Sequence, residues 1–237
     1  VVALEVLRAK GFHPDIVAGH SVGEITALVA AGVISLEDGL RIVETRAIAM
    51  QIACKEKQGA MAAIIGLNDQ EIDTLCESVQ KFGYIKPANF NCPGQVVISG
   101  EQSTVRLAME EAKKRGAKRT FELLVSGAFH SDLMQKAVEP LANILEKISF
   151  LPAKLPVVPN VTAESTKDPS LLKHLLIKQV ISPIKWTASM NHLISGGLIQ
   201  ALEVGPGNIL SGLMRRINRS ILISRSGTRS EIEGLVL

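Results

Sequence analysis

Residues 16–31 read Ile16-Val17-Ala18-Gly19-His20-Ser21-Val22-Gly23-Glu24-Ile25-Thr26-Ala27-Leu28-Val29-Ala30-Ala31, in which a Gly-x-Ser-x-Gly pentapeptide joins a strand-like run to a helix-like run. A sharp turn from strand to helix crowds and strains the backbone, and we expect both glycines to be needed for that reason. The serine hydroxyl then stands clear of the sheet. The stretch therefore predicts an α/β fold with Ser21 as the candidate nucleophile; the alternative is a tight structural turn.

The helix predicted after Ser21 supplies favourable electrostatics. Its unpaired N-terminal amides and the positive end of its dipole face the serine. When Ser21 attacks a carbonyl, the backbone N–H of Val22 can donate a hydrogen bond to the oxyanion that forms. We therefore expect Val22 to be a backbone oxyanion donor.

The composition is that of an ordinary globular protein. The chain has 237 residues, 46% apolar and 21% charged, which suits one large domain or a domain with an insert. Only 3% of the residues are aromatic, which argues against stacking platforms for single-stranded nucleic acid. The net charge of +3 suits an acidic or phosphate-bearing partner without requiring one. Basic residues gather at 113–119 and at Arg215, Arg216 and Arg219.

The cysteines and the apolar runs bear on the compartment. Cys54, Cys76 and Cys92 are odd in number and lack Cys-x-x-Cys spacing, so we expect neither a disulfide framework nor a metal site. No uncharged apolar run is long enough to span a bilayer, and we see no leader peptide. We expect a soluble protein of the cytoplasm, or of an organellar matrix in a eukaryote. The chain starts without Met inside an apparent helix over residues 1–10, so we expect a missing upstream segment.

The middle of the chain, residues 57–127, has its own pattern. It predicts strands over 61–66, 85–90, 95–99 and 119–125, with helices over 69–80 and 104–115. Asn91-Cys92-Pro93-Gly94 makes the hairpin between the two central strands, and Gly116 follows the second helix as its cap. This β-α-β-β-α-β order predicts an inserted ferredoxin-like small subdomain.

The flanking segments, residues 1–56 and 128–237, predict one discontinuous large subdomain of the α/β-hydrolase type. Short apolar strands at 16–18, 157–161 and 199–204 alternate there with helices, one of them over 171–180. Such alternation predicts a mostly parallel sheet covered by helices on both faces.

The helix predicted after Ser35 carries an arginine without a partner. Ser35 is the expected N-cap, and Arg46 borders the apolar face. That face is marked by Leu36, Leu40, Val43, Ala47 and Met50. No Asp or Glu lies three or four residues from Arg46 on this helix, so its acceptor must come from elsewhere. A guanidinium can grip a substrate carboxylate through two parallel hydrogen bonds, and the alternative is a buried tertiary ion pair.

A serine nucleophile needs a base, and His130 is the candidate among five histidines. It stands between the last strand of the insert and a helix that starts near Ser131 and Asp132. Imidazole is the side chain best matched to proton transfer near neutral pH. Gln179 shares a helix face with three leucines, Leu172, Leu175 and Leu176, so a polar partner is expected there. The end of this helix can also offer a free carbonyl to an imidazole N–H.

With these residues in view, the chain resembles a known family through nearly all of its length: the malonyl-CoA:acyl carrier protein transacylases and the acyltransferase domains of fatty acid and polyketide synthases. Arg46 follows Ser21 by 25 residues, at the family's position for a carboxylate-binding arginine. The other matching segments are 19–24, 89–100, 126–131 and 203–207, with Gln179 at the position that orients the histidine.

The resemblance implies a ping-pong transfer of malonyl from coenzyme A to the phosphopantetheine thiol of acyl carrier protein. Ser21 would be the nucleophile, His130 the base, and Gln179 the residue that orients His130 through a carbonyl, with Val22 as oxyanion donor. Substrate-binding roles are implied for Arg46, His20, Phe129 and Asn91. The resemblance implies no cofactor or metal, no nucleic acid or membrane, and a monomer that binds malonyl-CoA and acyl carrier protein.

The sequence agrees with the family pattern at Phe129 and departs from it at the start of the chain. Phe129 resembles the malonyl-selective form, because a bulky ring leaves no room for an extra methyl. The family carries an N-terminal Gly-Gln-Gly segment that supplies a second oxyanion donor, and nothing in residues 1–237 matches it. We therefore expect that the chain is a fragment that lacks this segment and the first strand of the large subdomain.

Two alternative functions stay open. One is a serine esterase or thioesterase of the α/β-hydrolase type, which needs an acid between Ser21 and His130 in the chain. Asp69 and Asp73 are the available acids, but both lie on a helix of the insert, and this function leaves Arg46 without a role. The other is a non-catalytic fragment that docks carrier protein.

Overall fold

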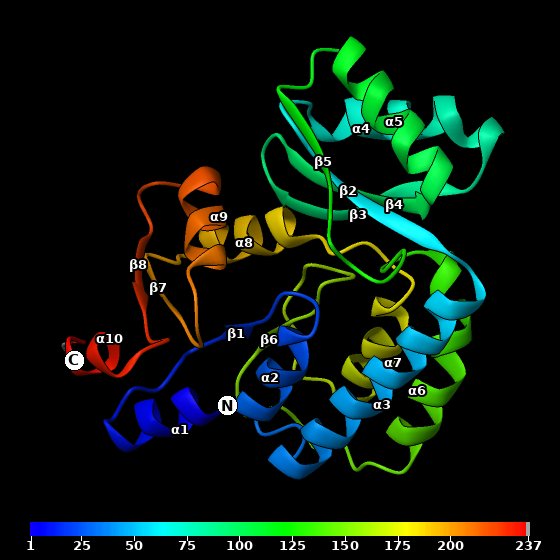
Figure 1. Cartoon of the computed structure of the whole chain (residues 1–237). Coiled ribbons are helices and arrows are strands. Elements are labelled where there is room, and N and C mark those ends of the chain that lie inside the picture. The colour runs from blue at the N-terminus through cyan, green and yellow to red at the C-terminus, as the bar shows by residue number, and fades with distance from the viewer. Residues whose placement is uncertain (236–237) are drawn as a thin grey trace.

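A computed structural model describes residues 1–235 (Figure 1). Its α-helices are α1 (Val2–Ala9), α2 (Gly23–Ala30), α3 (Leu36–Glu56), α4 (Asp69–Val79), α5 (Gln102–Lys114), α6 (Val138–Glu146), α7 (Pro169–Gln179), α8 (Trp186–Ser195), α9 (Ile209–Ile217) and α10 (Arg229–Glu233). Its strands are β1 (Val17–Ala18), β2 (Gly59–Ile65), β3 (Ile85–Cys92), β4 (Gln95–Glu101), β5 (Arg119–Glu122), β6 (Val157–Val158), β7 (Gln200–Glu203) and β8 (Leu222–Arg225).

The middle of the chain forms one four-stranded sheet in the order β3-β4-β2-β5. Its neighbouring strands all pair antiparallel, and α4 and α5 lie together against it (Figure 1). The helices and strands occur in the β-α-β-β-α-β order predicted from the sequence. The predicted hairpin is confirmed, with β3 and β4 joined by a turn at Pro93 and Gly94.

The parallel strands outside this sheet do not form the single sheet that we predicted. β1 pairs in parallel with β6, β7 pairs in parallel with β8, and no strand within residues 1–235 links the two pairs. The predicted strand 157–161 ends at Val158. Pro159 follows it, and a proline has no N–H for the strand ladder. The fold is therefore mixed α/β, with parallel and antiparallel pairs in separate sheets.

The face of α3 that packs inward differs from the predicted one. Leu36 and Leu40 are 46% and 62% exposed, and the buried residues of the helix are Gly39, Ile42, Arg46, Ala49, Met50, Ala53 and Cys54. Arg46 thus lies inside the buried face instead of at its border. The prediction was wrong because α3 carries two apolar stripes, and burial of a charged residue is the less expected choice. The predicted N-cap is confirmed, since the Ser35 hydroxyl accepts from the Asp38 N–H.

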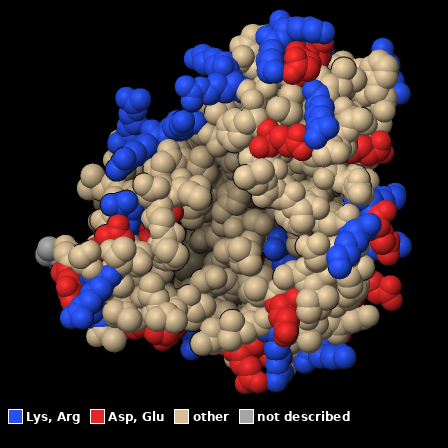
Figure 2. All heavy atoms as spheres, viewed as in Figure 1, with Lys and Arg blue, Asp and Glu red and all other residues tan. Residues whose placement is uncertain are grey.

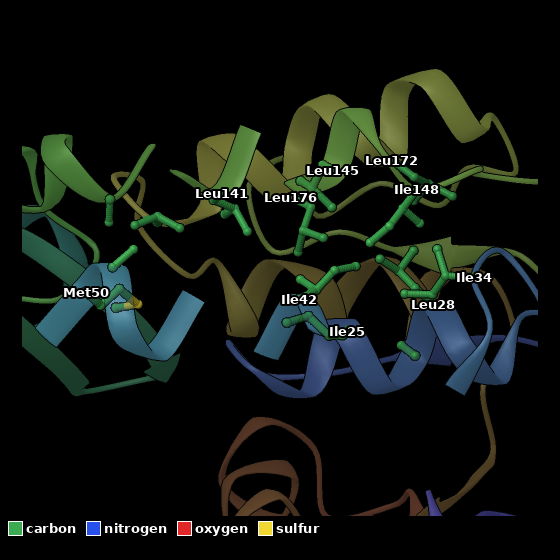
Figure 3. Packing of buried hydrophobic residues seen from close by; sticks show 14 of the residues in the cluster. Ile25, Leu28, Ile34, Ile42, Met50, Leu141, Leu145, Ile148, Leu172 and Leu176 are labelled. Carbon is green, nitrogen blue, oxygen red and sulfur yellow. The ribbon is translucent and has the colours of Figure 1, made fainter. Parts of the chain in front are cut away.

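The main apolar core lies where α2 and α3 pack against α6 and α7 (Figure 3). Ile42 on α3 and Leu28 on α2 are fully buried there, opposite Leu141, Leu145 and Leu176. This packing holds the N-terminus of α2 and the C-terminus of α7 at fixed positions. Across residues 1–235 every helix is too short or too polar to span a bilayer.

Candidate active site

The Ser21 turn has the strained geometry that the sequence predicted. Ser21 has φ of 54°, in the left-handed region that costs a non-glycine residue on the order of 1 kcal/mol. A Cβ at Gly19 would lie 2.0 Å from the Gly23 carbonyl oxygen, so only glycine fits there. A Cβ at Gly23 would meet no atom within 4 Å, so our prediction that both glycines are needed was wrong. Close approach of the backbone requires Gly19 alone.

The Ser21 hydroxyl is hydrogen-bonded to the His130 ring. Ser21 Oγ lies 2.8 Å from His130 Nε2, and His130 Nδ1 lies 2.9 Å from the backbone oxygen of Gln179. Because a carbonyl only accepts, Nδ1 carries the proton and donates it there, which leaves Nε2 free to accept from the hydroxyl. Burial lowers the pKa of His130 to about 3, so the imidazole is neutral at physiological pH. A neutral imidazole in this orientation can act as a general base.

Arg46 reaches the same hydroxyl from α3. Its Nη2 donates to Ser21 Oγ at 3.0 Å and to Gln179 Oε1 at 3.4 Å. It forms no ion pair with any carboxylate of residues 1–235, which argues against the alternative of a structural ion pair. Burial lowers the pKa of Arg46, and the charge of Glu24 acts in the opposite sense. An arginine guanidinium stays protonated in proteins, so Arg46 is a cation that can bind an anion beside the nucleophile.

The backbone at the start of α2 is open to an oxyanion. Val22 is the N-cap residue of α2, and within residues 1–235 its N–H donates no hydrogen bond. The amide lies next to Ser21 in the chain, at the positive end of the helix. It is therefore available to an oxygen that becomes negative when Ser21 attacks a carbonyl.

Three further predicted residues lie around this centre. His20 Nε2 is 2.8 Å from Asn91 Oδ1, and the His20 ring lies 5.4 Å from the ring of Trp186. Burial lowers the pKa of His20, so this ring is also neutral. Phe129 is half-buried and packs between the main core and the sheet residues Met61, Ala63, Ala88 and Val97. Trp186 was not predicted, although it is the only tryptophan in the chain.

Two buried residues that sequence reasoning missed tie these groups together. Asn160 hydrogen-bonds the turn on both sides of His20, and Glu24 accepts from the Asn160 N–H and from Gln179 Nε2, each at 2.8 Å. The signal was present in the sequence, because Asn160 interrupts an apolar run and Glu24 follows the pentapeptide directly. Neither residue could be assigned a partner without the tertiary structure.

Figure 2 shows a deep hollow in the centre of one face, between the four-stranded unit and the segment that carries α9. Its walls are mostly uncharged, and Lys and Arg side chains gather on the rim beside α9. Within residues 1–235 no group of three or more His, Cys, Asp or Glu could hold a metal ion. The predicted acids of the esterase alternative, Asp69 and Asp73, lie on α4, and the His130 N–H is already held by a backbone carbonyl.

A strained serine turn, a neutral histidine and an adjacent arginine on a mixed α/β fold define an acyl-transferring enzyme class, and comparison with known proteins agrees. The acyl transferase domain family matches residues 1–225, and the chain belongs to that family.

The named relatives belong to one kind of acyltransferase. The chain is 42% identical over 222 residues to the malonyl CoA-acyl carrier protein transacylase of Bacillus subtilis, covering 93% of this chain and 70% of the relative. It is 39% identical over 226 residues to the enzyme of the same name from Staphylococcus aureus, covering 95% and 73%.

Solved structures agree with these relatives. A malonyl-transacylase in complex with a type II polyketide acyl-carrier protein matches with a TM-score of 0.94 and 40% identity, covering 98% of this chain and 76% of that one. The malonyl CoA-acyl carrier protein transacylase of Coxiella burnetii matches with a TM-score of 0.94 and 38% identity, covering 98% and 73%.

Proposed function

We propose that this protein is an acyltransferase that moves a malonyl group from coenzyme A to the phosphopantetheine thiol of acyl carrier protein through an ester of Ser21. The names of the relatives support the substrates, and a solved relative in complex with an acyl-carrier protein supports the partner. The observation that carries the mechanism is the Ser21 hydroxyl, which is hydrogen-bonded to His130 at 2.8 Å and to Arg46 at 3.0 Å.

The first half-reaction forms the malonyl ester. His130 Nε2 takes the hydroxyl proton while Ser21 Oγ attacks the thioester carbon, and the oxyanion accepts from the Val22 N–H. The carbon–sulfur bond then breaks, and His130 returns the proton to the thiolate of coenzyme A. No carboxylate is needed behind the imidazole, because the Gln179 carbonyl oxygen holds Nδ1 at 2.9 Å.

The second half-reaction reverses these steps with a different thiol. His130 takes the proton of the phosphopantetheine thiol, and the sulfur attacks the ester carbon. The ester bond breaks, and Ser21 Oγ recovers the proton from His130. Atoms and protons therefore balance over the cycle without a cofactor.

Arg46 and Phe129 select the acyl group in this proposal. The Arg46 guanidinium pairs with the free carboxylate of malonyl and holds the ester in one orientation. Phe129 fills the space that a methyl branch would need, with His20 and Asn91 as further substrate contacts. A Phe129→Ser variant that gains no loading from methylmalonyl-CoA would refute the steric role of Phe129.

The domain boundaries and the cellular setting are part of the same proposal. Residues 57–127 form a ferredoxin-like small subdomain, supported by the strand order β3-β4-β2-β5. Residues 1–56 and 128–235 make up the large subdomain of the α/β-hydrolase type, and the last two residues of the predicted range 128–237 lie outside the described residues. The enzyme acts as a cytoplasmic monomer; a sedimentation experiment that gives a dimer mass would contradict the monomer.

Incubation with labelled malonyl-CoA followed by holo-acyl carrier protein tests the function. We expect stable label on Ser21, transfer of the label to the carrier protein, and little free malonate. Rapid release of malonate would instead indicate the thioesterase, and absence of label would indicate a docking fragment. Ser21→Ala should take no label.

The base is tested by a pair of histidine variants. His130→Ala should slow loading by about 10³-fold or more. His192→Ala, whose exposed ring contacts Ser165, should load like the wild type. Equal loading by both variants would remove His130 from its role as base.

A further inference from the structure

Asn160 lies at the point where the Ser21 turn meets the neighbouring strand. β1 and β6 pair in parallel with Val17 beside Val157 and Ala18 beside Val158. Continuing this register by two residues brings Asn160 beside His20. Asn160 is fully buried, so each of its polar atoms needs a partner within the protein.

The side chain of Asn160 bridges the turn. Its Nδ2 donates to the Gly19 carbonyl oxygen at 2.8 Å, and its Oδ1 accepts from the Ser21 N–H at 2.8 Å. One partner can only accept and the other can only donate, so the residue between them must offer both a donor and an acceptor. Among side chains of this length, only asparagine does so at every pH.

The same residue connects the turn to the support of His130. Asn160 Oδ1 also accepts from Gln179 Nε2 at 3.2 Å, and that amide nitrogen lies 3.1 Å from the Ser21 carbonyl oxygen. The Asn160 backbone N–H donates to Glu24, whose carboxylate also accepts from Gln179. The backbone oxygen of Gln179 holds the His130 ring. One polar network thus spans from the nucleophile to the base.

We propose that Asn160 is a positioning residue for the transfer reaction, and that it holds the strained Ser21 turn in register with Gln179 so that the hydroxyl faces His130. This inference rests on the proposed function. Ser21 has φ of 54°, and such a conformation persists only where its surroundings over-determine it. The hydrogen bonds to Gly19 and Ser21 supply that restraint directly. Asn160 itself forms no hydrogen bond with the Ser21 hydroxyl, whose partners are His130 and Arg46.

Kinetics of Ser21 loading with labelled malonyl-CoA test this role. For Asn160→Ala we expect the maximal loading rate to fall by about 100-fold, because a displacement on the order of 1 Å has that effect on a reacting group. The KM for malonyl-CoA should change by less than about threefold, since Asn160 is fully buried and its side chain is hydrogen-bonded within the protein. Asn68→Ala is the matched control, because Asn68 only caps α4, where its Oδ1 accepts from the Glu71 N–H at 2.9 Å.

A nearly isosteric variant covers the case in which the alanine variant does not fold. In Asn160→Asp, the carboxyl group can donate to the Gly19 oxygen only when it is protonated, and burial raises its pKa. Its loading rate relative to wild type should therefore rise as the pH falls from 8 to 6. Because protonation of a buried carboxyl also stabilises the fold, the ratio is taken only where circular dichroism shows the variant fully folded at both pH values, and there a role limited to folding leaves the ratio constant.

The outcomes separate the two proposals. Absence of label on the wild type would overturn the proposed function itself. A labelled wild type, together with an Asn160→Ala rate within threefold of it or a pH-independent ratio for Asn160→Asp, would overturn the positioning role alone.

Discussion

The four-stranded sheet and the Ser21 site solve opposite packing problems within one chain. The sheet and its two helices bury an almost purely apolar cluster, in which Ile64, Ile72, Leu75, Ile85 and Ile98 are fully buried. Around Ser21 the buried residues are polar, namely Glu24, Arg46, His130, Asn160 and Gln179. Burial of apolar surface stabilises the sheet region. Around Ser21, hydrogen bonds among the buried polar groups offset the cost of removing them from water.

The contrast shows where this molecule gives up stability for chemistry. Ser21 and His130 both have positive φ, at 54° and 56°. The charged side chains Glu24 and Arg46 each bury one atom without a partner among residues 1–235, Oε1 and Nε. In the four-stranded unit the buried atoms without a partner belong to neutral hydroxyl groups, those of Ser99, Thr104 and Thr120. Substitutions around Ser21 should therefore change activity or the pH dependence of stability, and substitutions in the sheet should change stability alone. Three experiments test this difference.

Arg46→Ala should give the largest effect, and only on activity. Loss of the guanidinium should reduce the preference for malonyl-CoA over acetyl-CoA by about 100-fold, because the site then lacks the partner of a carboxylate. The melting temperature should stay nearly constant, since a partly unsatisfied buried charge is removed. Arg41→Ala is the control on the same helix, where an exposed Arg41 pairs with Glu37. Unchanged acyl preference would remove Arg46 from its proposed role.

Glu24→Gln should give a smaller effect that depends on pH. Burial raises the pKa of Glu24 from 4.5 to about 7, so the folded protein binds the proton more tightly than the unfolded chain does. Protonated Glu24 therefore contributes its full share to the free energy of unfolding of the wild type below pH 4.5, and this contribution is lost as the pH rises towards 7. The lowered pKa of His130 makes the fold more stable as the pH rises, but this contribution is present in both the wild type and Glu24→Gln.

Thermal melts of the two proteins should show this difference. The melting temperature of Glu24→Gln relative to wild type should rise by several degrees between pH 5 and pH 8. A difference that does not vary with pH would contradict the raised pKa and weaken the contrast between the two regions.

Ile64→Val should give the smallest effect, and only on stability. Loss of one buried methyl group from the sheet should lower the free energy of unfolding by about 1 kcal/mol. Chemical denaturation measures this, and the rate of Ser21 loading should be unchanged. Ile52→Val on the exposed side of α3, where Ile52 is 51% exposed, should change neither quantity. A slower loading rate in Ile64→Val would show that the regions are coupled.

The sequence was most informative where local pattern and local structure coincide. The pentapeptide predicted the turn at Ser21, and the end of the 171–180 helix predicted a carbonyl for an imidazole, which is where the Gln179 oxygen meets His130. Each prediction rested on a local pattern, namely the pentapeptide and the end of one helix, although the pairing of His130 with Gln179 spans 49 positions. The order of elements in 57–127 followed from periodicity for the same reason.

What could not be predicted depends on tertiary partners. Helix α3 has two apolar stripes, and the elements that pack on the helix decide which of them is buried. The sequence therefore placed Arg46 at the border of the apolar face, although the residue is buried. Asn160 and Glu24 meet across 136 positions of sequence, and no periodicity joins them. The separation of the parallel strands into two pairs also depends on spatial neighbours.

The use of a main-chain oxygen behind His130 changes how this site responds to mutation. A codon change can delete an aspartate side chain, but any amino acid at position 179 keeps a carbonyl group. Drift at this position therefore alters the amide contacts with Ser21, Glu24 and Asn160 before it removes the acceptor of Nδ1. The hydrogen-bond acceptor that orients the His130 ring is therefore present whatever residue occupies position 179. Selection can act only on the side-chain contacts of that residue.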